Sequence, residues 1–330
     1  MLTFFPRIQS STPGAFFVAA GAEPAPGYRL KRVRGRGGFA EVWEADSPAG
    51  PVALKFMVSA NTGTTARELR SLQSLQALDH PFLVKTQSVF TVPGYIVIAM
   101  ELADGTLLDL HQVYMNDFGQ LISPKELCLY MWQVADALDF LNARRHTGPD
   151  GRKVGYQHAD VKPNNVLLFA DVAKLTDYGL ATATHGPSTP CPRAGSRDYC
   201  APELYNGTLT DTSDQYSLAV TYYVLRTGRF PFPPQPVQGP PVKSVFQSPP
   251  ELAGVSQGEK AALGRALAIV PQARFPTCRD LMTCLIRANG LKVIWTDEGT
   301  WKIVKDEDTM VDGPKTEADR TAHPPRRTSR

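Results

Sequence analysis

In the first hundred positions the apolar residues mostly form short compact runs, whereas after about residue 120 they recur at helical spacing. Compact apolar runs at 51–58 and 95–102 are typical of buried strands, and glycines join two further strands over 28–46. Leucines recur at helical spacing over 64–80. The first part of the chain is therefore predicted to be mostly strand with one helix.

Longer amphipathic patterns predict that the second part is helical. Ser123 is a natural cap and Pro124 a natural first-turn residue for a helix over 123–145. The same kind of pattern predicts helices over 212–228, 258–269 and 277–290. Prolines over 230–241 predict a surface loop, and residues 291–304 resemble a hairpin around Glu298–Gly299.

These patterns predict an α+β fold with a small strand-rich lobe, a larger helical lobe and a cleft between them. We expect a flexible N-terminal segment over 1–25 and one bilobal domain over 26–289, divided into lobes 26–103 and 104–289. The remainder, 290–330, is predicted to be the hairpin and a disordered tail. No internal repeat is present.

Composition narrows the classes of protein but selects none. The 330 residues carry 42% hydrophobic and 20% charged residues and a net charge of +3, which gives no indication of nucleic-acid binding. No long apolar window or signal peptide is found, so we expect a cytoplasmic protein without a membrane span. The five cysteines form no CxxC pair, so no zinc site or disulfide framework is indicated.

The segment "GRGGFAEV", residues 35–42, carries the first candidate chemistry. Gly35, Gly37 and Gly38 would let the backbone approach phosphate groups closely, although a tight hairpin turn favours glycines as well. Lys55 ends a buried strand and needs an anion, unless it lies at an edge and reaches water. Glu68 is the only acid in the helical segment 64–78 and is the partner available there.

A glycine loop, a strand lysine and a helix glutamate in this order resemble the protein kinase family. The stretch "HADVKPNN" matches the catalytic-loop pattern of that family, and "LTDYGLA" places Tyr178 where phenylalanine is usual. The matching positions are His158, Asp160, Lys162, Asn165, Asp177, Tyr178, Gly179, Ala201, Pro202, Glu203, Asp214 and Arg274. The order of these positions over about 28–285 is a highly specific signal.

The resemblance implies a role for each residue in the reaction. Asp160 would accept the proton of the substrate hydroxyl, Lys162 would offset phosphoryl charge, and Ser196 would bridge these two. Asn165 and Asp177 would hold Mg²⁺. His158, Tyr178, Gly179, Glu203, Asp214 and Arg274 would have structural roles.

The resemblance also implies an ATP site. Lys55 would bind the phosphates with Glu68 as its partner, and Met100 would lie at the back of the pocket. Backbone groups of Glu101 and Ala103 would bind the adenine edge. The full set is Arg34, Gly35, Arg36, Gly37, Gly38, Phe39, Ala40, Glu41, Val42, Ala53, Lys55, Glu68, Met100, Glu101, Ala103 and Leu167, of which Val42, Ala53 and Leu167 would enclose the base.

The chain departs from the family pattern at three places. Ala40 stands where a third glycine is often found. The helix that holds Glu68 has about one extra turn, so a different register would place Ser71 opposite Lys55. Ala159 stands where many members have an arginine that a phosphate on the activation segment neutralises. We therefore expect that phosphorylation at Thr182, Thr184, Ser188 or Thr189 is not required for activity.

The resemblance predicts a protein serine/threonine kinase. Lys162 and Ser196 are typical of the serine/threonine class, and the uncharged Asn164 and Thr106 predict no strong demand for an upstream arginine in the substrate. The stretches "RELRSLQSLQALDHPFLV" and "MELADGTLLDL" look most like bacterial, planctomycete-type members. The alternatives are a pseudokinase scaffold and a small-molecule phosphotransferase. Protein substrates are the expected partners, and the oligomeric state is not indicated.

Overall fold

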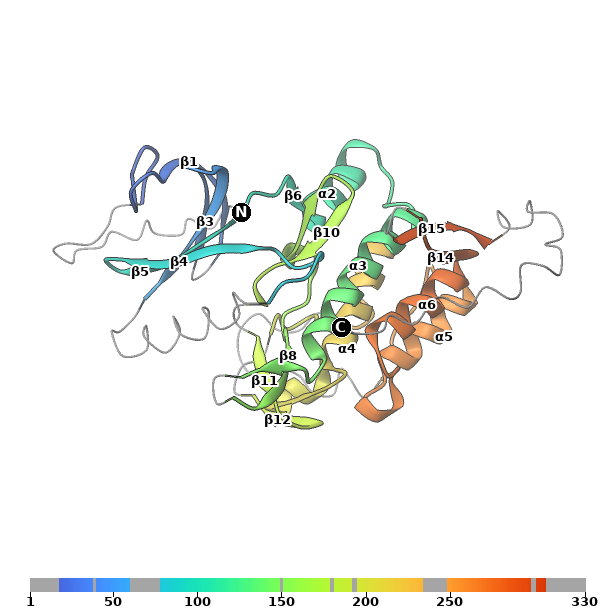
Figure 1. Ribbon diagram of the computed structural model, residues 1–330. Helices are drawn as coiled ribbons and strands as arrows, with labels where there is room; N and C mark the ends of the chain where they lie inside the picture. The colour runs from blue at the N-terminus through green and yellow to red at the C-terminus, as the bar shows by residue number, and fades with distance from the viewer. Residues whose placement is uncertain are drawn as a thin grey trace, which may run out of the picture.

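The strand-rich lobe is a five-stranded antiparallel sheet in the order β1-β2-β3-β5-β4 (Figure 1). The computed structural model describes residues 18–37, 40–59, 78–148, 151–178, 181–191, 195–233, 248–297 and 301–306. The strands of the sheet are β1 (Arg29–Arg36), β2 (Ala40–Ser47), β3 (Gly50–Val58), β4 (Thr86–Val92) and β5 (Tyr95–Glu101).

Buried side chains from the central strands form the core of this lobe. Trp43, Leu54, Phe56 and Val97 pack together, as the apolar runs predicted. The packed unit also reaches back into the segment expected to be flexible. The backbone of Leu30 exchanges hydrogen bonds with that of 21–22, and Val18 contacts the same core.

The second lobe is mainly helical and follows the end of β5 (Figure 1). Its helices are α2 (Leu107–Asp117), α3 (Pro124–Asn142), α4 (Ser213–Thr227), α5 (Gln257–Ala266) and α6 (Cys278–Ala288), with 3₁₀ turns at Pro163–Asn165, Pro202–Asn206 and Pro271–Ala273. Its short strands are β6 (Gly105–Thr106), β7 (His146–Thr147), β8 (Lys153–Gln157), β9 (Val166–Phe169), β10 (Val172–Leu175), β11 (Thr182–Thr184), β12 (Ser188–Pro190) and β13 (Thr208–Thr210).

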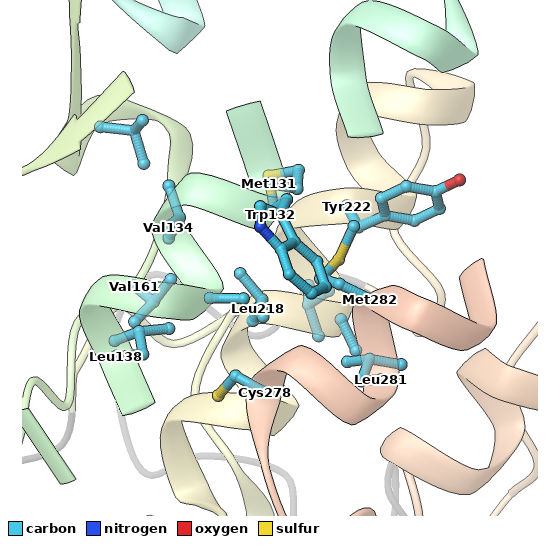
Figure 2. Close-up of a cluster of buried hydrophobic side chains, with 14 of the residues drawn as sticks. Met131, Trp132, Val134, Leu138, Val161, Leu218, Tyr222, Cys278, Leu281 and Met282 are labelled. Carbon is cyan, nitrogen blue, oxygen red and sulfur yellow. The ribbon is translucent and has the colours of Figure 1, made fainter. Parts of the chain in front are cut away.

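Helices α3 and α4 form the centre of this lobe. The hydroxyl of Ser123 accepts a hydrogen bond from Glu126 N at the start of α3, which confirms the predicted cap. Every residue of α4 from Ser213 to Leu225 is buried, and the helix ends at Gly228 with a positive φ of 70°. Figure 2 shows side chains from α3, α4 and α6 packed together with Val161. The loop that carries Asp160 therefore lies directly on the core.

The predicted C-terminal hairpin is confirmed in its strands, β14 (Leu291–Trp295) and β15 (Trp301–Lys305). Trp301 of the hairpin packs edge-on against Trp132 of α3, with ring centroids 5.8 Å apart. None of the helices in the described part of the chain is long and apolar enough to cross a membrane.

Several predictions concern residues outside those that the structure describes. They include nearly all of the helix over 64–80 with Glu68 and Ser71, the turn at Glu298–Gly299, most of the proline-rich loop, and the tail from 307 onward. The same holds for Gly38, Phe39 and Gly179.

Candidate active site

An ion pair joins the two lobes at the predicted site. The Lys55 Nζ atom on β3 lies 2.5 Å from Asp177 Oδ1, although 122 positions separate the two residues in the chain. Only 13% of the Lys55 side chain is exposed. Within the described residues, Asp177 therefore supplies the anion that a buried strand lysine requires.

The Asp160 carboxylate lies at the centre of a group of hydrogen bonds. Lys162 Nζ lies 2.8 Å from Asp160 Oδ2, and Ser196 N donates to Asp160 Oδ1 at 2.8 Å. Lys162 Nζ also contacts Ser196 Oγ at 2.6 Å, so the predicted bridge between Asp160 and Lys162 is present. Burial alone would raise the pKa of Asp160, but Lys162 and Ser196 hold this pKa below its usual value. The carboxylate is therefore ionised at neutral pH.

Helix α4 holds the backbone of the Asp160 loop. The buried Asp214 carboxylate accepts hydrogen bonds from His158 N at 2.6 Å and Ala159 N at 2.8 Å. These bonds constrain Ala159 in the left-handed region, with φ of 63°. The His158 ring contacts the Thr176 carbonyl oxygen at 2.7 Å, which ties this loop to the strand that precedes Asp177.

Asn165 and Asp177 present oxygen atoms of the kind that Mg²⁺ prefers. The Asn165 Nδ2 atom donates to the Asp160 carbonyl oxygen and to Asp160 Oδ2, which leaves the Asn165 amide oxygen as an acceptor. In the described part of the chain, no group of three or more His, Cys, Asp or Glu residues could hold a metal ion alone. This arrangement fits Mg²⁺, which is usually bound by one or two protein ligands together with substrate phosphates.

An apolar cluster lies where the base was expected. Its buried members are Ala53, Val84 and Met100, and the partly buried Val42 and Leu167 pack against them. Val42 and Ala53 come from the sheet lobe, whereas Leu167 comes from β9 of the helical lobe. Side chains from both lobes thus meet around one apolar surface.

The predicted glycine segment is partly described. Gly35 and Arg36 lie on β1 opposite Val42 and Glu41 of β2, and Gly37 N donates to the Ala40 carbonyl oxygen at 2.8 Å. A tight turn between two strands, as the glycines predicted, is consistent with this pairing. The Arg36 and Glu41 side chains form an exposed ion pair at 3.1 Å.

The segment that links the lobes, from Glu101 at the end of β5 to Asp104 before β6, is held from both sides. The Glu101 carboxylate contacts Lys174 Nζ of β10 with both oxygens at 2.8 Å. From β1, Arg34 donates to the carbonyl oxygens of Ala103 and Asp104. The sequence did not indicate this contact between Arg34 and the linking segment. It indicated only that Arg34 lies next to the glycines.

The structural positions carried over from the family also form contacts. Glu203 and Arg274 make a two-pronged ion pair at 2.7 and 2.8 Å, and the Arg274 side chain has no exposed surface. The Tyr178 hydroxyl donates to the Val84 carbonyl oxygen at 2.6 Å. The extra oxygen of tyrosine, compared with the usual phenylalanine, is therefore hydrogen-bonded although it is buried.

Gly195 is a residue of the site that the sequence did not indicate. A Cβ atom at Gly195 would lie 2.0 Å from the Ala159 carbonyl oxygen, closer than real Cβ atoms approach any atom. The backbones of the Ser196 segment and the Asp160 loop thus touch at this point. One glycine beside a serine is common in loops, so the sequence carried no usable signal.

The remaining predicted features are a substrate position and two thiols. Thr106 caps α2, and its backbone N and hydroxyl both contact the Asp109 carboxylate at 2.8 Å.

Cys191 and Cys200 are both buried. Burial raises the pKa of Cys200 to about 11, so this thiol is protonated at neutral pH and a poor redox switch.

Comparison with known proteins agrees with this geometry. A family model described as "Protein kinase domain" matches residues 28–288. Serine/threonine-protein kinase PknH of Mycobacterium bovis is 32% identical over 268 residues, covering 77% of this chain and 42% of PknH. Serine/threonine-protein kinase PknE of the same species is 30% identical over 266 residues, covering 77% of this chain and 44% of PknE. The chain thus spans less than half the length of these bacterial relatives.

Proposed function

The chain belongs to the protein kinase family, and we propose that it transfers the γ-phosphoryl group of ATP to serine or threonine hydroxyls of proteins. The observation that carries this proposal is the convergence of Lys55, Asp160, Asn165 and Asp177, through direct hydrogen bonds or one intervening segment, at the junction of the lobes. The names of the bacterial relatives support the serine/threonine class.

Asp160 is the group that acts on the acceptor. Its ionised carboxylate orients the substrate hydroxyl and takes its proton as the oxygen attacks phosphorus. Lys162, held by Ser196, places positive charge beside this carboxylate and offsets the charge of the transferring group. The Ser196 contacts keep both side chains in position before substrate arrives.

The nucleotide is bound by groups from both lobes. Lys55 binds phosphate oxygens, while Val42, Ala53 and Leu167 enclose the base, with Met100 behind it. Asn165 and Asp177 would hold Mg²⁺, which would supply neutralising charge to the phosphates. Lys55 is already paired with Asp177, so the positive group and the metal ligand are close together.

We also propose that activity is independent of phosphorylation on the activation segment. Two antiparallel pairings hold this segment, β11 with β8 and β12 with β13, and Ser196 N bonds to Asp160 beyond them. Ala159 contributes no positive charge that a phosphate would neutralise. The described parts of this segment are therefore held by backbone hydrogen bonds that need no phosphate group.

A variant with Thr182, Thr184, Ser188 and Thr189 all changed to alanine should keep most of the wild-type activity. Thr184 is buried, whereas Ser188 is exposed, so Ser188→Glu serves as a matched test of added charge. Near-complete loss of activity in the alanine variant, with its thermal unfolding unchanged, would refute independence from phosphorylation.

The predicted substrate preference follows from the groups near the acceptor site. Asn164 is uncharged, and the Asp109 carboxylate already accepts hydrogen bonds from the backbone N–H and the hydroxyl of Thr106. A peptide array should therefore show no dominant upstream arginine. An arginine-dominated profile would contradict this assignment. The planctomycete-type origin and the cytoplasmic location stay predictions.

One experiment separates the kinase from its alternatives. Purified protein is incubated with labelled ATP, Mg²⁺ and myelin basic protein, beside Asp160→Asn, which keeps the shape of the side chain but removes its charge. Transfer to the protein that is lost in the variant is the expected result. The same protein is also tested for ADP binding and for transfer to small hydroxyl compounds. Binding of ADP without any transfer would favour a pseudokinase scaffold, and transfer only to the small compounds would favour a small-molecule phosphotransferase.

A further inference from the structure

Arg34 connects the sheet lobe to the segment between the lobes. It lies on β1 directly before Gly35, and its Nη2 atom donates to the carbonyl oxygens of Ala103 at 3.1 Å and Asp104 at 2.7 Å. The neighbouring Arg32, two positions earlier on the same strand, is 68% exposed, whereas the Arg34 side chain is 28% exposed. Arg34 is therefore directed toward the linking segment, and Arg32 toward solvent.

Glu44 of β2 positions the Arg34 side chain. The Glu44 carboxylate is 15% exposed and lies 3.6 Å from Arg34 Nη1. It also accepts a hydrogen bond from Arg32 Nε at 2.8 Å. The Arg34 guanidinium is thus held through Nη1 by Glu44 on the sheet and through Nη2 by two carbonyl oxygens on the linking segment. These contacts fix its position.

The backbone of Ala103 presents its two polar groups differently. Its carbonyl oxygen is engaged by the Arg34 cation. Its N–H group donates to no acceptor within the residues that the structure describes. At the position where the proposed function places the edge of the base, Ala103 thus offers a donor, while its carbonyl oxygen already accepts a hydrogen bond from the positively charged Arg34 guanidinium.

This arrangement distinguishes the two purines. Adenine presents the N6 amino donor and the N1 acceptor on its edge, so Ala103 needs to supply only its N–H, to N1, while the backbone of Glu101 is the expected partner of N6. Guanine presents the O6 acceptor beside the N1–H and N2 amino donors. The O6 and N1–H groups of guanine suit an N–H and a C=O of one residue, but here the donors of guanine would meet the Arg34 guanidinium. Buried donors without acceptors are costly.

We propose that Arg34 is a specificity-determining residue that makes this site select adenine over guanine nucleotides. The inference rests on the proposed function, because it requires a nucleotide between the lobes with its base at Ala103. Removal of the guanidinium frees the Ala103 carbonyl oxygen, so guanine nucleotides gain an acceptor while adenine nucleotides lose little.

The test compares the binding of ADP and GDP, each with Mg²⁺, by isothermal titration calorimetry. Arg34→Met keeps the aliphatic stem but removes the donors, and Arg32→Met is the matched control on the same strand. Wild type should prefer ADP, and Arg34→Met should lower the ratio of ADP to GDP affinity by about tenfold or more, through tighter GDP binding. Arg32→Met should leave the ratio within about twofold.

Each other outcome overturns the inference. An unchanged ratio in Arg34→Met, with ADP still bound, refutes the role of Arg34 but leaves the proposed function intact. Equal effects of the two arginine variants show that only general charge matters. Failure of wild type to bind either nucleotide overturns both proposals. Glu44→Gln, which loosens Arg34 without changing it, should lower the ratio in the same direction and guards against a folding defect in Arg34→Met.

Discussion

Gly195→Ala tests whether the close approach of two backbones holds Asp160, the proposed catalytic group, in place. The added Cβ would lie 2.0 Å from the Ala159 carbonyl oxygen, and 3.0 Å is the closest approach that real Cβ atoms show. The two segments must therefore separate by about 1 Å. Ser196 N is the next group along the chain, so its 2.8 Å bond to Asp160 would lengthen beyond hydrogen-bonding distance.

A displacement of about 1 Å at a reacting group can lower the rate by about 100-fold. We expect kcat for phosphorylation of myelin basic protein to fall by about this factor, while ADP affinity measured by calorimetry stays near wild type. The control is Gly186→Ala, because Gly186 lies in the same segment with open space around it and no positive φ. Activity of Gly195→Ala within about twofold of wild type would refute the reasoning, as would an equal loss in Gly186→Ala.

Three further predictions concern buried groups away from the nucleotide. Arg274→Met leaves the Glu203 carboxylate without its partner, so the free energy of unfolding in urea should fall by about 3–5 kcal/mol, and a fall below about 1 kcal/mol would contradict a buried pair. Burial alone would raise the pKa of Glu203, but Arg274 holds it below its ordinary value of 4.5. The ionised carboxylate stabilises the fold above that pH, and this stabilisation is lost as the pH falls through the pKa of Glu203 in the folded state. The difference in unfolding free energy between wild type and Glu203→Gln should therefore shrink below pH 4.5. A difference independent of pH would argue against the ion pair. Cys200, with its pKa raised to about 11, should react slowly with iodoacetamide at neutral pH in the native protein and rapidly in urea, whereas fast native labelling would indicate an accessible thiolate.

Much of the fold could be predicted because its long elements carry strong local patterns. The strands β3 and β5, and the helices α3, α4 and α6, agree with their predicted ranges to within a few residues. The strand β4 and the helix α2 were not predicted, and neither were the two- and three-residue strands of the helical lobe. Such short strands contain too few side chains for an alternation to be recognised, and tertiary contacts stabilise them.

The sequence by itself determined which chemical groups this protein possesses and the order in which they occur along the chain. Lys55, Asp160, Asn165 and Asp177 were identified in this way, because family motifs are local patterns of residue type. The sequence also determined where α3 begins, at the Ser123 cap, and where α4 ends, at Gly228, since caps act on the backbone within one turn.

Only the tertiary structure decided which of these groups meet. Asp177 contacts Lys55 across 122 positions, Gly195 lies so close to the Ala159 carbonyl oxygen that no Cβ fits between them, and Arg34 donates to the Ala103 carbonyl oxygen. No local pattern encodes such contacts, because they depend on how the sheet lobe and the helical lobe pack against each other. A residue's type states what it can bind, whereas its partner is determined by the packing of distant segments.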